Sequence, residues 1–429
     1  MIRIIKLISI SLMLSLNFVA SAQQTPCLSY KDYIRKNVAD KKEVDVFLNE
    51  LSWAKFDPVT GYRLGNYMPH DGVDNSSSIS TSQPNGARTS FLYSNKKSRI
   101  NAYGNSFTQC HQVSDGETWE EYLAANLGEP IRNFGMGGFG AYQAYRRMLQ
   151  TEQTGDSAEY MIYYIWGDDH VRSLLRCRYM LIREWTKTQD KQEGIGKMFH
   201  GNFWANIEMN LSTGRLEEKN NLISSKQGLY KMTDPAWMNE ALDGDLALQM
   251  SLYKNGAIND IDVAKLKKLA TCLNYKIDLD NPDLLKESIN ELLDKYSFAA
   301  TEYLLNKIKI FASLHNKKLM VVLFDPYRVT KELLQNKPRY DQQIVDFLKK
   351  NQFNVFDMNL VHVEDFKVYN LSVGDYYKKY FIGHYNPSGN HFFAFSIKPH
   401  IVDWLNPKPI TYQNTFDQMI NFKGYLENY

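Results

Sequence analysis

The stretch RINAYGNSFT, residues 99–108, predicts a buried strand from Arg99 to Tyr103 that is closed by Gly104 and followed by Ser106. A serine in a strand-to-helix loop is often a helix cap or a turn residue. It also lies where ligands bind in open α/β sheets, outside the carboxyl ends of the strands. Ser106 is therefore a candidate nucleophile, and its role depends on the motifs that accompany it.

Two further motifs accompany Ser106. Asn133-Phe134-Gly135-Met136-Gly137-Gly138-Phe139-Gly140 follows a second short apolar run, and His384-Tyr385-Asn386-Pro387-Ser388-Gly389-Asn390 lies near the C-terminus. Their order resembles the SGNH (GDSL-like) hydrolase superfamily over about residues 98–170 and 317–405. The resemblance implies that Ser106 is the nucleophile, that Gly138 lines the oxyanion hole and that His384 is the general base.

Short apolar runs alternate with amphipathic segments from Arg99 onward, which predicts an α/β fold with a parallel sheet covered by helices. Asn386 is expected to cap the last helix, with Pro387 in its first turn. The resemblance implies a flavodoxin-like three-layer α/β/α arrangement with a five-stranded parallel sheet, the SGNH hydrolase fold. We expect strands at about 98–104, 130–134, 159–166, 318–324 and 353–357, and further helices at about 117–127, 140–152, 297–315 and 339–351.

Residues outside this pattern divide the chain into further segments. Residues 171–295 are rich in Lys and Glu and predict a helical insertion, which either shapes a substrate cleft or is structural. Residues 23–97 contain many turn residues and predict an extended arm with short strands packed on the core. The α/β core is expected at 98–170 and 296–406, with a C-terminal tail at 407–429.

The N-terminus has the charged, apolar and small-residue regions of a secretory signal peptide over residues 1–22. Cleavage would release a secreted or periplasmic protein that keeps no membrane anchor. The formal net charge is +2, and Arg3 and Lys6 both lie in this peptide, so the mature chain is neutral. A neutral chain offers no basic field for nucleic acid.

No metal or cofactor is expected, because no pair of His residues or carboxylates has the spacing of metal ligands. The four cysteines, Cys27, Cys110, Cys177 and Cys272, also lack such spacing. Export permits disulfides. A Cys110–Cys177 bridge is one candidate pairing, because each of these residues closely follows a loop of the proposed site, but the sequence does not decide the pairing.

The first departure from the family pattern is Asp168 in Trp166-Gly167-Asp168-Asp169, where the family has Gly-x-Asn-Asp. An ionised carboxylate would repel a developing oxyanion. Asp168 would donate a hydrogen bond only if an apolar site kept it protonated. Otherwise it swings away from the oxyanion or binds a cationic group. We retain Asp168 as a candidate catalytic residue with these alternatives open.

The second departure is the residue that orients the histidine, because Phe381 stands where the family commonly has an Asp three positions before the His. Asp375, Asp325 or Asp357 could supply a carboxylate, and a backbone carbonyl would give a Ser-His dyad.

Three other histidines, His391, His111 and His170, are alternatives to His384 or neighbours of the motif loops. His391 is a rival base, but it lies inside the expected last helix, so His384 at the mouth of that helix is preferred. His111 and His170 follow the first and third motif loops, where they line the pocket or, as we expect, are solvated.

The residues and the resemblance together predict an exported serine esterase that removes acyl, chiefly acetyl, groups through an acyl-enzyme at Ser106. Its partner would be an acylated small molecule or polysaccharide, and the 28 Tyr and 7 Trp favour a carbohydrate because sugar rings stack on aromatic faces. One alternative is a polysaccharide O-acyltransferase that uses the same residues. Another is a catalytically weakened carbohydrate-binding protein, which Asp168 and Phe381 favour.

Overall fold

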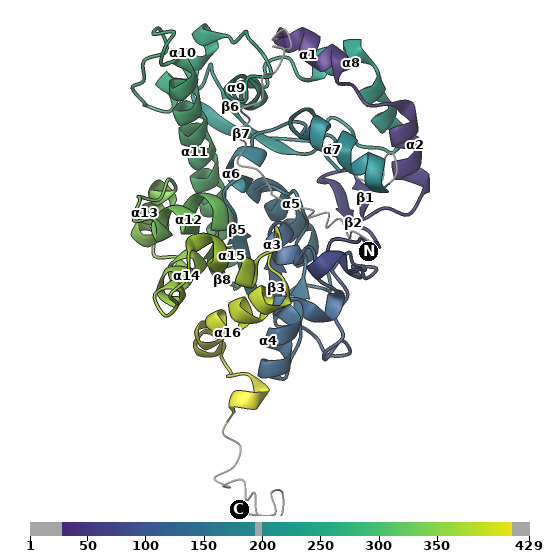
Figure 1. Ribbon diagram of the computed structural model, residues 1–429, viewed down its shortest axis with the longest axis vertical. Helices are drawn as coiled ribbons and strands as arrows, with labels where there is room; N and C mark the ends of the chain where they lie inside the picture. Colours follow the sequence, from purple (N-terminus) through teal and green to yellow (C-terminus); the bar gives the residue numbers. More distant parts are fainter. Residues whose placement is uncertain (1–27, 194–199, 414–429) are drawn as a thin grey trace, which may run out of the picture.

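A parallel five-stranded sheet forms the centre of the molecule (Figure 1). The computed structural model describes residues 28–193 and 200–413, so the expected signal peptide lies outside the described residues. The strand order is β4-β3-β5-β8-β9, the doubly wound order 2-1-3-4-5, and each strand falls within a stretch predicted from the sequence. The strands are β3 (Ile100–Tyr103), β4 (Ile131–Asn133), β5 (Tyr160–Ile165), β8 (Lys318–Leu323) and β9 (Asn354–Asp357).

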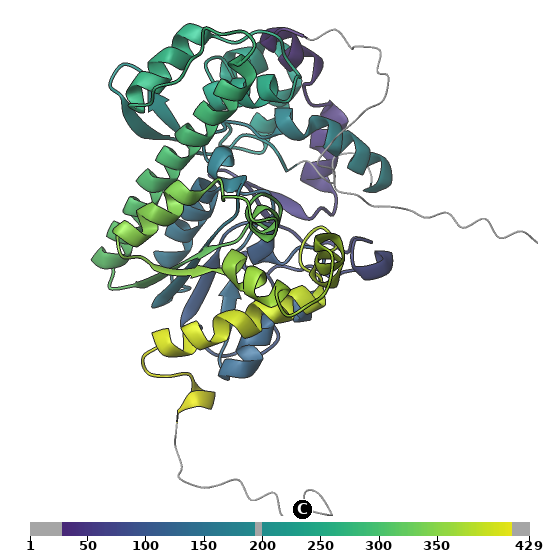
Figure 2. The ribbon, with the colours of Figure 1, turned by 60° about the vertical axis from the view of Figure 1, so that its left-hand side comes forward.

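Helices cover both faces of the sheet, and alternate residues of β5 enter two separate hydrophobic cores. Met161, Tyr163 and Ile165 pack in the core that includes α5 (Ala141–Glu152) and α11 (Leu285–Leu314). Tyr160, Ile162 and Tyr164 pack in the core that includes α4 (Trp119–Leu127) and α16 (Pro387–Trp404). A strand that is buried on both faces has apolar side chains along its whole length, and the sequence of β5 has this pattern. The result is a three-layer α/β arrangement (Figures 1 and 2).

The helices that flank the site begin close to where the sequence predicts them. Asn386 caps α16 by accepting a hydrogen bond from the Gly389 amide at 2.8 Å, with Pro387 in the first turn. From cap preferences the sequence also predicts that the helix at about 117–127 opens behind Asp115, and this prediction was wrong. Thr118 caps this helix, because Asp115 lies in a short 3-10 turn and forms a buried ion pair with Arg88 at 2.8 Å.

The remaining helices of the core follow the loops after β3 and β5, or connect and follow the last two strands. They are α3 (Ser106–Gln109), α6 (Asp169–Arg172), α12 (Lys331–Leu334), α13 (Gln342–Lys350), α14 (Met358–Phe366) and α15 (Val373–Tyr380).

Residues 171–295 contain helices and also a β-hairpin, which the sequence did not predict. Figure 2 shows that α11 runs without interruption from this segment down beside the sheet, so the helix expected at 297–315 begins earlier, at Leu285. The other elements are α7 (Tyr179–Glu193), α8 (Pro235–Ala241), α9 (Leu246–Lys254), α10 (Val263–Cys272) and the hairpin strands β6 (Asn206–Asn210) and β7 (Arg215–Lys219).

The expectation of an extended arm at the N-terminus was wrong for residues 30–49. This segment forms α1 (Tyr30–Lys36) and α2 (Lys41–Asn49), which precede a hairpin of β1 (Ala54–Asp57) and β2 (Gly61–Leu64). Asp40 and Glu43 form a capping box at the start of α2, a sequence signal that the turn-rich composition of the following residues obscured.

The candidate Cys110–Cys177 disulfide was also wrong. Both cysteines are free and buried, and they belong to different hydrophobic cores. Cys27 lies outside the described residues.

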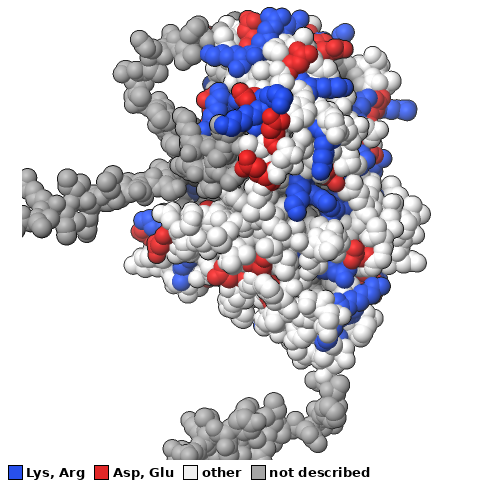
Figure 3. Space-filling view, turned by 90° about the vertical axis from the view of Figure 1, so that its right-hand side faces the viewer, with Lys and Arg blue, Asp and Glu red and all other residues white. Residues whose placement is uncertain are grey.

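The described helices include none with both the length and the apolar character needed to cross a membrane. On the face in Figure 3, Lys and Arg are interspersed with Asp and Glu over the upper part of the view, and the lower part carries fewer charges. The described residues on that face therefore form no broad field of a single sign.

Candidate active site

Ser106 is the first residue of α3, directly beyond the carboxyl end of β3. The side chain of Asn105 caps this short helix by accepting a hydrogen bond from the Phe107 amide at 2.8 Å. The same side chain donates to Asp169, which also accepts from the Trp166 amide at 2.9 Å. These bonds tie the loop after β3 to the loop after β5. The serine thus lies at the point where the strand order reverses, the usual ligand position in such sheets.

His384 lies next to Ser106 although nearly the whole core separates the two residues in sequence. The Nε2 atom of His384 is 2.8 Å from Ser106 Oγ, and its Nδ1 atom is 3.0 Å from Oε1 of Gln112. The imidazole therefore bridges a hydroxyl on one side and a side-chain amide on the other. This is the geometry of a nucleophile, a base and a residue that orients the base.

The surroundings of Gln112 determine which ring nitrogen of His384 carries the proton. The backbone amide of His384, which can only donate, lies 2.7 Å from Oε1, and Nε2 of Gln112 lies 3.0 Å from the carbonyl oxygen of Asp71. The amide of Gln112 is thereby fixed with its oxygen toward the imidazole. His384 must donate from Nδ1, which leaves the lone pair of Nε2 facing the Ser106 hydroxyl.

Arg88 holds the loop that carries Gln112. Its buried guanidinium donates to the carbonyl oxygens of Cys110 and Val113 and pairs with Asp115. Gln112 itself has a φ of 73°, in the left-handed region. The position of Gln112 thus depends on a long-range contact and an uncommon backbone conformation.

None of the three carboxylates proposed from the sequence contacts His384. Asp325 caps the turn after β8 by accepting from two backbone amides, one of them that of Tyr327 at 2.9 Å. Asp357 pairs with Arg339, and exposed Asp375 pairs with Lys378. Gln112 occupies that position instead, and the sequence reasoning missed it because a glutamine in a loop has no characteristic spacing.

Burial keeps His384 in its neutral form. It lowers the pKa of His384 to about 3, and the nearby His111 acts in the same direction. The carboxylate of Asp71 opposes this shift, but it lies 3.2 Å from Nε2 of His111 and is thus shared with that ring. Across neutral and mildly acidic pH, His384 is therefore an unprotonated acceptor.

Gly138, the residue that the resemblance assigns to the oxyanion hole, lies beside Ser106 in the same cavity. The amides of Gly135 and Gly137 already donate to Asn133 Oδ1 at 2.9 Å and to Gln109 Oε1 at 2.6 Å, whereas Gly138 lines the same cavity as Ser106. Its φ of 80° requires glycine, and a Cβ atom there would collide with Arg178.

Asp168 does not lie with these residues. Its side chain is 48% exposed and pairs with Arg172 at 3.3 Å and with Arg328 at 3.9 Å. It is not among the residues that line the cavity, and of the alternatives left open by the sequence the geometry selects the binding of cationic groups. The adjacent Asp169 is buried instead, and burial raises its pKa to about 7.

The other histidines divide between the cavity and the core. His111 lines the cavity beside Asp71. His391 of α16 packs on Tyr122 of α4 and does not line the cavity. The solvated role expected for His170 was wrong, because this residue is 3% exposed and bonds Thr301 of α11 at 2.8 Å.

The cavity in front of Ser106 measures about 380 Å³, and six Trp, Tyr and Phe residues contribute to its walls. Guanidinium groups of Arg172 and Arg178 also line it. The aromatic residues are Trp53, Tyr67, Phe107, Trp166, Trp185 and Tyr327.

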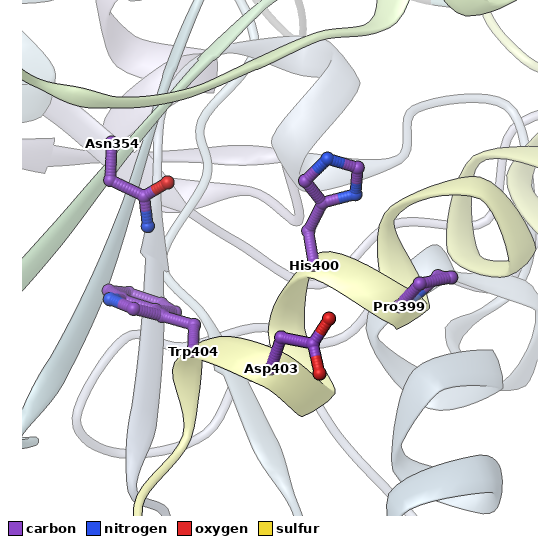
Figure 4. A pocket seen from close by; sticks show the side chains of 5 residues that line it. All are labelled: Asn354, Pro399, His400, Asp403 and Trp404. Carbon is purple, nitrogen blue, oxygen red and sulfur yellow. The ribbon is translucent and has the colours of Figure 1, made fainter.

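A second cavity of about 360 Å³ lies at the other edge of the sheet (Figure 4). His400, Asp403 and Trp404 of α16 line it, opposite Asn354 at the amino end of β9. It brings together none of the predicted site residues. Within the described part of the chain, no group of three His, Cys, Asp or Glu residues could hold a metal ion.

Comparison with protein-family models and with curated proteins finds no match for this chain. The arrangement of Ser106, His384, Gln112 and Gly138 is therefore the basis for a functional assignment.

Proposed function

We propose that this protein is a serine esterase of the SGNH hydrolase type, exported from the cell, that removes acyl groups from a carbohydrate. One observation carries the proposal: Ser106 Oγ lies 2.8 Å from the unprotonated Nε2 of His384. This contact lies at the carboxyl edge of the sheet and opens into a cavity with aromatic walls.

In the proposed acylation step, Nε2 of His384 accepts the Ser106 proton while Oγ attacks the carbonyl carbon of the ester. The amides of Ser106 and Gly138 donate to the oxyanion that forms. When the intermediate collapses, the bond to the alcohol oxygen breaks and His384 returns the proton to that oxygen. The alcohol leaves, and the acyl group remains on Ser106.

In the proposed deacylation step, water replaces the alcohol. His384 takes a proton from the water, whose oxygen attacks the acyl-enzyme carbonyl, and the same amides stabilise the second oxyanion. Collapse releases the carboxylic acid and restores the Ser106 hydroxyl. Gln112 holds the Nδ1 proton throughout, so the same tautomer serves both steps.

A glutamine in place of the usual carboxylate gives orientation without charge. In a Ser-His-Asp triad the carboxylate fixes the tautomer and also stabilises the imidazolium that forms. Gln112 can perform only the first of these roles. We therefore expect this protein to turn over its substrate more slowly than enzymes with a complete charged triad do.

Aromatic residues support a carbohydrate substrate. Tryptophan and tyrosine rings offer flat apolar faces with polar edges, on which pyranose rings stack. Trp53, Tyr67, Trp166, Trp185 and Tyr327 all contribute to the cavity wall beside Ser106. An acetylated saccharide is thus the substrate that the wall favours over a long acyl chain.

Acetate release from p-nitrophenyl acetate and from acetylated saccharides tests the proposal. We expect Ser106→Ala and His384→Ala to lower kcat by about three orders of magnitude or more. His391→Ala is the matched control and should keep wild-type activity, because His391 does not line the cavity. A folded wild-type protein that releases no acetate from any of these esters would contradict hydrolysis, and acetyl transfer to an added saccharide would identify an acyltransferase instead.

A further inference from the structure

Two arginines form part of the wall of the cavity that contains Ser106. Arg178 lies against Gly138, since a Cβ atom on that glycine would collide with the guanidinium. Arg172 lies over the indole ring of Trp166, with its guanidinium carbon 4.8 Å from the ring centroid. Both arginines line the cavity. A substrate held at Ser106 would therefore meet at least one guanidinium group.

The two arginines differ in their counter-ions. Arg172 pairs with Asp168 at 3.3 Å and with Asp169 at 3.4 Å. Among the side chains that the structure describes, those of residues 28–188 and 200–413, no carboxylate oxygen lies within 4.0 Å of Arg178. The single acid among the residues that line the cavity, Asp71, is paired with His111. Among those described side chains, the positive charge of Arg178 thus has no carboxylate in contact, and Asp168 attracts it only from a greater distance.

Tyr62 holds the guanidinium of Arg178 in place. The fully buried Tyr62 hydroxyl donates to the carbonyl oxygen of Gly137 at 3.0 Å and accepts a hydrogen bond from Arg178. Burial, together with the charge of Arg172, lowers the pKa of Arg178 to about 10. A guanidinium has five donor hydrogens in a rigid fork. This one is therefore a positioned donor group whose charge is poorly compensated.

We propose that Arg178, assisted by Arg172, binds an oxyanionic substituent of the substrate, so that the ester cleaved here is carried by an acidic saccharide. The inference rests on the proposed esterase function. A guanidinium fork matches the two oxygens of a carboxylate, sulfate or phosphate group. The aromatic wall would hold the sugar ring, and Arg178 would fix the ring's charged substituent beside Gly138.

A kinetic comparison of neutral and acidic esters tests this specificity. For Arg178→Gln we expect KM for an acetylated uronic acid oligosaccharide to rise by about tenfold to a hundredfold, the range of a lost hydrogen bond to a charged group. Activity on p-nitrophenyl acetate and acetylated xylo-oligosaccharide should fall much less, so that the ratio of kcat/KM for the acidic ester to that for a neutral ester drops by about tenfold or more. Arg178→Lys should restore part of the affinity, and Arg215→Gln, an exposed arginine of β7, should change nothing.

An equal loss on neutral and acidic esters would overturn the proposal, because it would make Arg178 a donor to the reacting oxyanion. Folding is not expected to confuse the result. Arg178→Gln removes a poorly compensated charge from a buried position, so its Tm should equal or exceed that of wild type.

A binding measurement separates this inference from the esterase proposal. Calorimetric titration of the Ser106→Ala protein with trigalacturonate, glucose sulfate, glucose phosphate and neutral maltotriose requires no catalysis. We expect at least one of the acidic ligands to bind, maltotriose to bind more weakly, and the addition of Arg178→Gln to abolish the difference. Equal binding of acidic and neutral ligands, or binding that Arg178→Gln leaves unchanged, would refute the anion site even if the esterase is active.

Discussion

Gln112 is the residue that most distinguishes this site. Its Oε1 atom accepts hydrogen bonds from both the backbone amide and Nδ1 of His384, and its Nε2 atom donates to the carbonyl of Asp71. In each of these three contacts only one partner can donate the hydrogen bond. The tautomer of His384 is therefore determined by neutral groups. The pKa of His384, lowered to about 3 by burial, is consistent with a base that has no carboxylate bonded to it.

Substitution of Gln112 should separate orientation from charge. Gln112→Met removes the acceptor at Nδ1 and frees the ring to take the wrong tautomer, so kcat should fall by about two to four orders of magnitude. Gln112→Glu keeps an acceptor and adds a charge that stabilises the imidazolium. The pKa of His384 should therefore rise, and the acidic limb of the kcat/KM profile should move to higher pH.

The pH dependence of kcat/KM on p-nitrophenyl acetate measures both effects. Wild-type activity should persist well below pH 6.5, because the lowered pKa keeps His384 unprotonated there. Wild-type kcat in Gln112→Met would show that Gln112 does not orient the base.

Helix α16 shows how much of the site its sequence signals could predict. The Asn386-Pro387 start was predicted from cap preferences and is confirmed, and it fixes the chain two residues after His384. The loop of Gln112 could not be predicted in this way. Its position depends on the left-handed backbone of Gln112 and on Arg88, which reaches the loop from a distant part of the chain. The resemblance thus pointed to Ser106, Gly138 and His384, which line one cavity, but no local signal pointed to the residue that orients the base.

Loss of the α16 cap should affect both stability and catalysis. Asn386→Ala removes the acceptor for the Gly389 amide and the donor to the Lys379 carbonyl, so the free energy of unfolding should fall by about 1 kcal/mol. The value of kcat should fall as well, because the turn that carries His384 loses its anchor. Denaturant unfolding and esterase assays measure the two effects.

Asp262→Ala is the matched control, since Asp262 caps α10 in the insertion by accepting from the Lys265 amide. It should cost similar stability and leave kcat unchanged. If Asn386→Ala lowers stability alone, the cap does not position the base.

At the scale of the whole molecule, the elements that are most deeply buried were the ones that the sequence predicted best. The central strands β3, β5 and β8 are largely buried, and the sequence revealed them because a strand buried on both faces has a nearly continuous apolar pattern. The edge strand β9 is only partly buried, and it was found from its place after a predicted helix. The segment 171–295 contains a hairpin, and α11 crosses the expected boundary between segment and core. Packing against distant elements decides such features, so local composition did not reveal them.

The core also contains a histidine whose neutrality links folding to pH. His362 is fully buried between the hydroxyls of Tyr376 at 2.8 Å and Tyr385 at 2.6 Å, and burial lowers its pKa to about 3. The unfolded chain protonates this residue near pH 6.5. The contribution of His362 to stability is therefore complete above pH 6.5 and is lost as pH falls toward 3.

The difference in unfolding free energy between wild type and His362→Gln should thus change by about 2 kcal/mol between pH 7.5 and pH 5, to the disadvantage of wild type. Denaturant titrations of both proteins at each pH measure this difference, and other titrating groups cancel because the two proteins share them. A difference that is constant with pH would mean that His362 is protonated in the folded protein.

Covalent labelling of the folded protein with a fluorophosphonate tests the central claim most directly, because it reports an activated serine without requiring the natural substrate. The account predicts one adduct per chain, located on Ser106 by peptide mass spectrometry and lost in both Ser106→Ala and His384→Ala. An unlabelled folded protein, or an adduct on another residue that persists in Ser106→Ala, would contradict the assignment of Ser106 as the nucleophile.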